Sequence, residues 1–480
     1  MCKLSNIEPQ KVFRYFEEIS KIPRGSGNME AISEYCVDFA KKHNLKYIKD
    51  DANNVVIFKN ASKGYENSKP VILQGHMDMV CQKTDEYEIN FEKDGIDIFV
   101  DGDFIKAKGT TLGADNGIAM AMMLSILEDE SSEHPPLEAV FTTDEEVGMV
   151  GASALDVSIL KGRRMINLDS EEERALTVSC AGGSDVKITI PFTKAIKKGT
   201  KITIKLKGLQ GGHSGVEIDK GRINANILMG RVLNHLNKIF SFNIIAINGG
   251  TKRNAIPFEC EVQLLVEDVD GFEKELIKYF SIVKEEISDA EPNCALGFSN
   301  DGQGEFEVLE KCVTDKIIYM LVITPNGIER MSKAIEGLVE TSLNLGVLET
   351  LKNEILMQYA LRSNKKSALD FLEKKMQTFA QFNNCKVEIS GRYEPWEYRE
   401  KSGLREVYVQ AYEEKLGKKP DIEAIHAGLE CAVFSASIEN LDCIAIGPDM
   451  FDVHTAEESL SISSTKKIFE VLCQTLKKLI

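Results

Sequence analysis

Apolar runs of strand length alternate with helical segments over the first third of the chain. Strand-like runs occur at 54–58, 71–74 and 137–142, and helical patterns occur at 28–43 and 116–128. Such alternation is typical of an α/β fold with a mostly parallel sheet flanked by helices. In sheets of this kind ligands bind beyond the carboxyl ends of the strands, so polar residues that follow the strands are the first candidates for a site.

The pattern changes at about residue 185. In 201–207 apolar residues alternate with lysine and threonine, which predicts strands with one wet face. This style continues to about residue 395, after which the α/β style resumes. A chain of 480 residues needs more than one core. The sequence therefore predicts a discontinuous α/β domain formed by 1–185 and 396–480, interrupted by an inserted α+β domain at 186–395.

Charge and cysteine usage limit the classes of partner. Asp plus Glu number 75 against 58 Lys plus Arg, and the net charge of -17 repels nucleic acid and anionic lipid. No apolar run is long enough to cross a membrane, and the charged first 23 residues do not resemble a secretion signal. The eleven cysteines are scattered without a C-x-x-C pair, as expected for reduced thiols in the cytoplasm.

His76 and Asp78 follow an apolar strand directly, in the segment VILQGHMDMV. Residues two apart on extended backbone point the same way, which suits an imidazole ligand and a carboxylate that orients it. When such a pair stands alone, a solvated strand end is the better explanation.

Asp115 lies in GTTLGADNGIAMA, where glycines at 109, 113 and 117 allow close backbone approach. An ordinary aspartate cap at the start of the following helix is the alternative interpretation. In FTTDEEVGMVGA, Glu145 and Glu146 follow a strand, and consecutive acids are unfavourable unless cations offset them. One of the two could bind metal while the other holds a water as general base. The alternative is a solvated acidic loop.

Asp169 ends a further strand in NLDSEEE, and His454 lies shortly before the last helix in FDVHTAEES. Neither residue indicates a site alone. Together, two histidines and three carboxylates lie after strands of one α/β domain, and one metal site explains all five. Imidazole and carboxylate without thiolate suit zinc, manganese or cobalt, and an aspartate shared by two ions is typical of two-metal hydrolases.

These motifs, H-x-D, G-x-D-N, E-E, D and a late H, occur in an order that resembles the di-zinc metallopeptidase family of aminoacylases, carnosinases and bacterial dipeptidases. The resemblance covers essentially the whole chain. The segments INLDSEEE, CAGGSDV, GLQGGHSGVEIDKGRINAN and IHAGLEC are similar to its aminoacyl-histidine (Xaa-His) dipeptidase branch. By this resemblance the α/β domain is catalytic and the insert is a lid.

The resemblance implies two zinc ions per subunit, with manganese or cobalt as substitutes. His76 and Asp169 would bind one ion, Glu146 and His454 the other, and Asp115 both. Glu145 would be the general base, Asp78 would support His76, and the peptide bond between Asp115 and Asn116 would be cis.

In the insert, His213 of GLQGGHSG resembles the lid histidine that polarises the scissile carbonyl, either in its own subunit or across a dimer. An exposed histidine in a glycine-rich hairpin is the alternative. Arg362 and Asn254 match positions that bind the substrate carboxylate, for which arginine is suited. Gly428 would allow close approach of substrate, and His426 is expected to be structural.

The expected reaction is hydrolysis of a dipeptide, Xaa-His or broader, by a water activated between two zinc ions. An amidohydrolase that acts on N-acyl amino acids is one alternative, and a scaffold protein that has lost catalysis is another. The resemblance also implies a homodimer formed through the lid.

Overall fold

The structure, a computed structural model, describes residues 3–480. The chain forms two compact units. Unit 1 comprises the chain up to Cys180 together with Trp396–Ala424 and Leu429–Ile480, and unit 2 comprises Ala181–Pro395 and Ile425–Gly428. Within the described residues no helix is both long and apolar enough to span a membrane.

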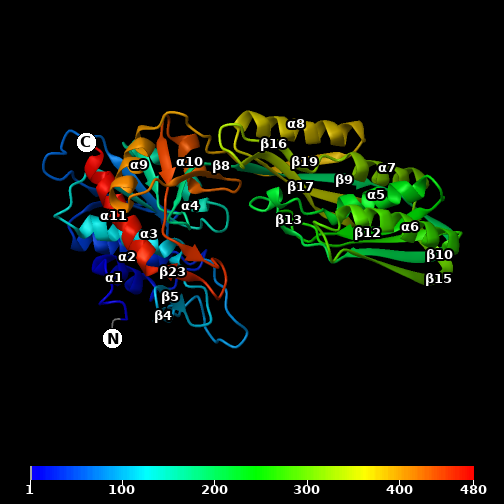
Figure 1. Cartoon of the computed structure of the whole chain (residues 1–480), viewed down its shortest axis with the longest axis horizontal. Helices are drawn as coiled ribbons and strands as arrows, with labels where there is room; N and C mark the ends of the chain where they lie inside the picture. Colours follow the sequence, from blue (N-terminus) through cyan, green and yellow to red (C-terminus); the bar gives the residue numbers. More distant parts are fainter. Residues whose placement is uncertain (1–2) are drawn as a thin grey trace. The chain divides into compact units, whose positions relative to one another are not determined.

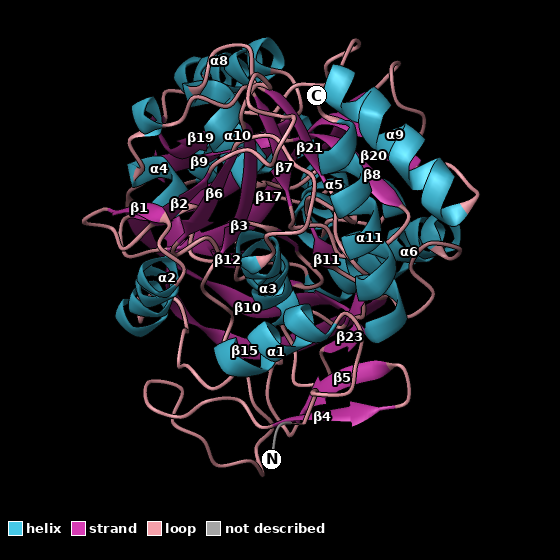
Figure 2. Ribbon diagram, turned by 90° about the vertical axis from the view of Figure 1, so that its left-hand side faces the viewer, coloured by secondary structure: helices cyan, strands magenta, loops and turns pink. Residues whose placement is uncertain are grey.

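Unit 1 is built on an eight-stranded sheet with the order β1-β2-β6-β3-β7-β21-β8-β20. Its central strands β6, β3, β7 and β21 are parallel neighbours, whereas β1, β2 and β8 join antiparallel. The bounds are β1 Lys46–Lys49, β2 Val55–Lys59, β3 Val71–His76, β6 Leu137–Thr142, β7 Arg164–Asn167, β8 Ala175–Cys180, β20 Asp421–Ile425 and β21 Asp442–Ala445. Figure 1 colours the chain from blue at its N-terminus to red at its C-terminus, and Figure 2 labels the strands of this sheet. The predicted α/β class is confirmed.

Helices pack against this sheet and against one another. Helix α3 contacts β3 and α1, and α9 contacts β21 and α11. The helices are α1 Gln10–Ile19, α2 Glu30–Lys42, α3 Ala114–Glu128, α4 Val150–Ala154, α9 Gly403–Leu416, α10 Glu430–Ser437 and α11 Ile462–Lys478. A small four-stranded sheet joins β4 Ile98–Asp101, β5 Phe104–Ala107, β22 Met450–Phe451 and β23 Ser459–Ser461.

Helix α3 is apolar all round and almost wholly buried, as expected for a helix at the centre of a domain. Its small residues let it approach the sheet closely. A Cβ atom added to Gly75 of β3 would lie only 2.8 Å from the Cβ of Ala119. This close contact fixes the start of α3, which carries Asp115, against the end of β3, which carries His76.

Unit 2 is an antiparallel sheet with the order β15-β10-β14-β12-β17-β18-β9-β19, to which β16 adds beside β17. Its strands are β9 Gly182–Pro191, β10 Lys194–Lys207, β12 Asn243–Gly249, β14 Cys260–Val266, β15 Ala295–Leu309, β16 Gly327–Met331, β17 Val339–Thr350, β18 Glu354–Ser363 and β19 Lys386–Tyr393. The helices α5 Ala225–Asn237, α6 Val269–Ile287, α7 Lys311–Ile323 and α8 Lys366–Phe382 bury one apolar stripe each in a single core with the sheet. Figure 2 distinguishes these helices and strands by colour.

Most predicted elements exist within a few residues of their expected bounds. The elements of unit 2 that were not predicted include strands β9, β15 and β16 and helix α7. Strand β15 lies at the edge of the sheet, and its middle residues are exposed and polar, so it lacks the apolar alternation of an inner strand.

Candidate metal centre

His76 is the last residue of strand β3 and is 1% exposed. Its Nδ1 lies 3.2 Å from the carbonyl oxygen of Asp78 and 3.3 Å from the Asp78 carboxylate. A proton on Nδ1 donates to these acceptors, which leaves Nε2 as the nitrogen available to a ligand. Asp78 therefore orients the ring of His76, as the spacing of the pair predicts.

The carboxylate of Asp115 lies between two groups of candidate ligand atoms. Its Oδ1 lies 3.0 Å from Nε2 of His76, which is 3.4 Å from Oδ1 of Asp169. Its Oδ2 lies 3.1 Å from Nε2 of His454, which is 2.8 Å from Oε1 of Glu146. The five predicted residues thus form two trios, each with one imidazole, that share the carboxylate of Asp115. The peptide bond between Asp115 and Asn116 is cis, as the family resemblance predicts.

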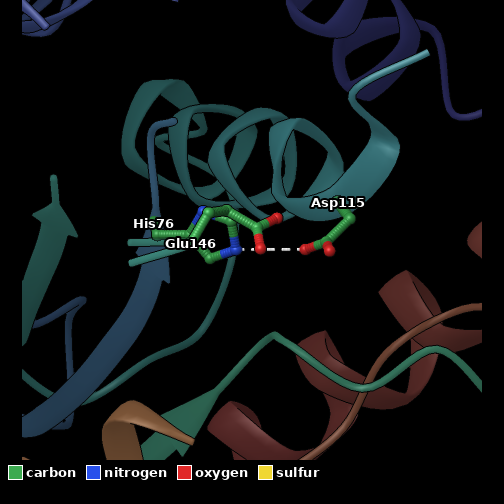
Figure 3. A group of neighbouring side chains, drawn as sticks. All are labelled: His76, Asp115 and Glu146. Atoms are coloured by element: carbon green, nitrogen blue, oxygen red, sulfur yellow. Dashed lines mark hydrogen bonds and ion pairs between the residues drawn. The ribbon is translucent and has the colours of Figure 1, made fainter. Parts of the chain in front are cut away.

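The spacing of these atoms suits a cation. Nitrogen and oxygen ligands about 2.0–2.2 Å from a tetrahedral ion lie roughly 3.3 Å from one another. Candidate ligand atoms of His76, Asp115 and Glu146 all lie within 4.8 Å of one another. Figure 3 shows these three side chains pointing toward one another, with Asp115 at the beginning of α3. The donor set contains imidazole and carboxylate and no thiolate, which fits zinc, manganese or cobalt.

The electrostatics of the centre also favour a cation. Burial alone would lower the pKa of the His76 imidazole, but the carboxylates of Asp169, Asp115 and Asp78 raise it well above its usual value. Hydrogen bonds with Asp115 and Glu146 raise the pKa of His454 to about 11. Both rings sit in a strongly negative field, and a divalent ion would be attracted by the same carboxylates.

Asp78 also holds the acidic pair in place. Its Oδ1 accepts the backbone N–H of Glu145 at 3.0 Å, and its Oδ2 accepts the backbone N–H of Glu146 at 3.2 Å and the hydroxyl of Ser26 at 2.8 Å. Burial raises the pKa of Asp78, yet His76 and these donors outweigh burial and bring it to about 2. Asp78 is therefore an anion that fixes the backbone positions of both glutamates.

Of the acidic pair Glu145 and Glu146, Glu145 makes no hydrogen bond or ion pair with either imidazole among the described residues. Burial raises the pKa of its carboxyl well above the usual value, and the nearby carboxylates of Asp169, Glu430 and Glu146 raise it further. A carboxyl with high proton affinity beside a metal centre suits a general base.

His213 lies in unit 2 on the short strand β11 Gly212–His213, which pairs with β13 Ala255–Ile256. Its Nδ1 accepts the backbone N–H groups of Gly215 and Val216, both at 3.2 Å. Because Nδ1 accepts, the proton of the neutral ring is on Nε2. Burial and the charge of Arg362 lower the pKa of His213, so the ring stays neutral near pH 7.

Arg362 of strand β18 lies close to His213. A Cβ atom on Gly215 would lie 2.9 Å from His213 Cε1, 3.1 Å from Arg362 Cζ and 2.7 Å from the carbonyl oxygen of His426. Gly215 therefore lets these three residues gather. Nη1 of Arg362 donates to the hydroxyl of Tyr393 at 3.3 Å, and its buried Nε has no partner among the described residues.

His426 lies in the segment Ile425–Gly428, which belongs to unit 2. It is 5% exposed and contacts Ser342 through Nε2 at 2.7 Å and Asn364 through Nδ1 at 3.2 Å. Burial and Arg362 lower its pKa to about 3, which fits the expected structural role. Asn254 is exposed just before β13, and its backbone carbonyl oxygen accepts the backbone N–H of Ser214 at 2.9 Å.

The sequence interpretation missed Glu430, a wholly buried acid at the start of α10. Its Oε2 accepts the hydroxyl of Thr142 at 2.7 Å and the amide of Gln74, while Oε1 is buried without a partner among the described residues. Burial and the carboxylate of Asp169 raise its pKa to about 8. The one signal was an acid between the apolar residues Leu429 and Cys431 in the segment IHAGLEC.

Comparison with known proteins identifies similar chains. Residues 72–478 match the model of peptidase family M20/M25/M40. The cytosol non-specific dipeptidase of Escherichia coli (strain K12) is 37% identical over 483 residues, which cover 100% of this chain and 99% of that protein.

Among solved structures, the aminoacylhistidine dipeptidase of Vibrio alginolyticus superposes with a TM-score of 0.92 at 36% identity and covers 99% of this chain and 97% of its own. An aminopeptidase from Bacillus cereus has a TM-score of 0.57 at 15% identity, with 98% and 99% covered, and shares the fold.

The buried carboxyl of Glu430 generates a prediction on stability. Because its pKa is raised to about 8 in the folded chain, the folded state holds a proton that the unfolded state releases near pH 4.5. The stability from this group is therefore complete below pH 4.5 and is lost as the pH rises to 8. Glu430→Gln mimics the protonated form, so its advantage over wild type should grow by roughly 1 kcal/mol per pH unit between pH 5 and 8.

Urea unfolding of chelator-treated protein at several pH values measures this difference. Glu439→Gln removes an exposed carboxyl two residues beyond the end of α10 and should show no such trend. A difference between Glu430→Gln and wild type that does not change with pH would contradict a protonated Glu430.

Proposed function

Since the chain belongs to peptidase family M20/M25/M40, we propose that it is a metal-dependent dipeptidase that hydrolyses a single peptide bond. The observation that carries this proposal is the pair of ligand trios that share the two oxygens of Asp115. The names of the Escherichia coli and Vibrio relatives support dipeptides as substrates.

In this proposal the five residues of the centre would hold two divalent ions, zinc first and manganese or cobalt as substitutes. His76 and Asp169 would hold one ion, Glu146 and His454 would hold the other, and Asp115 would contribute to both. When bound, such ions acidify a water and polarise the scissile carbonyl.

Glu145 is the proposed general base. Its carboxyl takes the proton of the attacking water and then gives it to the leaving amine. Its high proton affinity suits the first transfer, and the anchoring of its backbone N–H by Asp78 fixes its position. Asp78 acts through His76 and Glu145 and does not touch the substrate.

His213, Arg362, Asn254 and Gly428 are proposed to bind the substrate. The proton on Nε2 of neutral His213 would be donated to the carbonyl oxygen as negative charge develops on it, a contribution of a few kcal/mol in comparable sites. Arg362 suits the free carboxylate of a dipeptide because guanidinium binds carboxylate through two parallel hydrogen bonds. Its unpartnered Nε supports this role.

Removal of the base tests the mechanism. Glu145→Gln keeps the size of the side chain but cannot accept the proton, so kcat should fall roughly 100-fold to 10,000-fold while bound metal is unchanged. Dipeptide turnover and metal content by mass spectrometry measure the two effects. Glu172→Gln, which changes an exposed acid three residues after Asp169, is the matched control. Unchanged turnover by Glu145→Gln would show that another group is the base.

The choice of substrate is tested separately. Xaa-His dipeptides such as carnosine and Gly-His should be cleaved, and Leu-Gly too if specificity is broad. An N-acetyl amino acid should be cleaved far more slowly, since the named relatives are dipeptidases. Turnover of the acetylated compound alone would support an amidohydrolase. No turnover of any compound by protein with its full metal content would support the scaffold alternative.

We also propose that the chain is a cytoplasmic homodimer formed through unit 2. Helices α7 and α8 expose large apolar side chains, among them Val322, Phe371 and Phe382. The ten described cysteines are all free thiols, which agrees with a reducing compartment. Light scattering after size exclusion should give twice the 53.5 kDa mass of one chain, and a strict monomer at micromolar concentration would contradict the dimer.

A further inference from the structure

The segments that carry Asp115 and His454 are tied together by one buried carboxylate, that of Glu458. Glu458 is 2% exposed and lies four residues after His454. Its Oε2 accepts the backbone N–H groups of Leu112 and Gly113 at 2.7 and 3.0 Å. Its Oε1 accepts those of Ala114 and Asp115 at 2.8 and 3.4 Å. One side chain therefore holds every residue from 112 to 115.

These contacts require an anion. Each oxygen of Glu458 already accepts two N–H groups, so neither has a direction left for a proton of its own. Burial and the charge of Asp115 raise the pKa of the carboxyl above its ordinary value, and the backbone donors limit that rise. The positive charge of Arg24 nearby also favours the carboxylate. Hydrogen bonds from N–H to a carboxylate are roughly twice as strong as neutral ones, which suits a clamp.

Arg24 fixes the same region from the other side. It is 2% exposed, and its Nη1 donates to the carbonyl oxygens of Met77 and Asp78 at 2.9 and 3.0 Å. Its Nη2 donates to the carbonyl oxygen of Gly113. Arg24 thereby joins the segment that follows His76 to the segment that precedes Asp115.

Two glycines make room for this arginine. A Cβ atom would lie 2.5 Å from Nη2 of Arg24 if added to Gly113 and 2.6 Å if added to Gly117. The glycines around Asp115 thus serve a buried guanidinium, which explains the close approach that the sequence indicates there. Arg24 and Glu458 touch none of the candidate ligand atoms in the contacts described, so any effect on a bound ion is indirect.

We propose that Glu458, together with Arg24, is a positioning residue that sets the metal affinity of the centre. It holds Asp115 in register with His454, while Arg24 holds Asp115 in register with His76. This inference rests on the proposed function, because it takes the two trios to be metal ligands. A change at Glu458 should weaken metal binding and alter coordination without removing a ligand.

The test uses Glu458→Gln in the full chain, stripped of metal by a chelator. The new amide group would direct N–H donors at backbone N–H groups, so roughly half of the clamp becomes repulsive. We expect metal affinity, measured by zinc titration calorimetry, to fall about 10-fold to 100-fold with unchanged stoichiometry. The visible absorption of cobalt-saturated protein should also shift, which a residue that only stabilises the fold would not cause.

Glu457→Gln is the matched control, since it removes the same charge one position earlier from an exposed side chain. It should leave affinity and the cobalt spectrum unchanged. Glu458→Asp retains the anion and should recover part of the affinity. If Glu458→Gln does not fold, Arg24→Lys provides the second test, because lysine keeps the charge but cannot bridge the two segments. Its affinity should fall at least 10-fold.

The two hypotheses fail in different ways. If wild-type protein binds zinc and His76→Ala weakens binding, the ligand assignment stands. Wild-type affinity together with a wild-type cobalt spectrum in Glu458→Gln, or in Arg24→Lys where that is the variant that folds, would then overturn the positioning role alone. If wild type binds no zinc, or His76→Ala binds it equally well, the proposed metal centre is wrong and the positioning role falls with it.

Discussion

The crowding of acidic side chains at one end of the unit 1 sheet is the constraint that the rest of the structure satisfies. Buried carboxylates repel one another, and each needs a compensating charge, hydrogen-bond donors or a proton. Asp115 contacts two imidazoles, and Asp78 and Glu458 accept backbone N–H groups. Glu430 has only neutral partners and keeps its proton to about pH 8. The environment of each acid thus determines its protonation and its role.

The parallel arrangement of the central strands explains why these acids meet. Strands β3, β6 and β7 are neighbours that run in the same direction, so the residues that follow them emerge at one edge. His76, Glu146 and Asp169 are such residues, and α3 brings Asp115 to them because Gly75 and Ala119 permit close packing. The sequence therefore could predict the fold class and the gathering of the five ligand candidates, since both depend on strand patterns and on polar residues at strand ends.

The supporting residues could not be predicted in the same way. Arg24 is a single charged residue in a loop, and nothing in the neighbouring sequence indicates that it is buried against Gly113 and Gly117. Glu458 resembles any acid of an acidic protein until its four N–H donors are seen. Strand β15 was missed for a related reason, because an edge strand pairs on one side only and tolerates glycine and polar residues. Sequence patterns reveal elements in which apolar residues are buried at regular intervals. The roles of Arg24 and Glu458 and the place of strand β15 depend instead on single contacts that form only in the folded chain.

In unit 2 the candidate substrate-binding residues carry positive charge and no carboxylate. The cluster of His213, Arg362 and His426 contains one permanent cation, Arg362, and burial and this cation keep the two histidines neutral. The turn after His213 also favours the neutral ring of His213, because a second proton on the ring would have to displace the two N–H groups bound to Nδ1. The ring therefore keeps a single donor, on Nε2, over the physiological pH range. A neutral donor beside a fixed cation is suited to a substrate that carries a permanent carboxylate and gains negative charge on its carbonyl oxygen only during reaction.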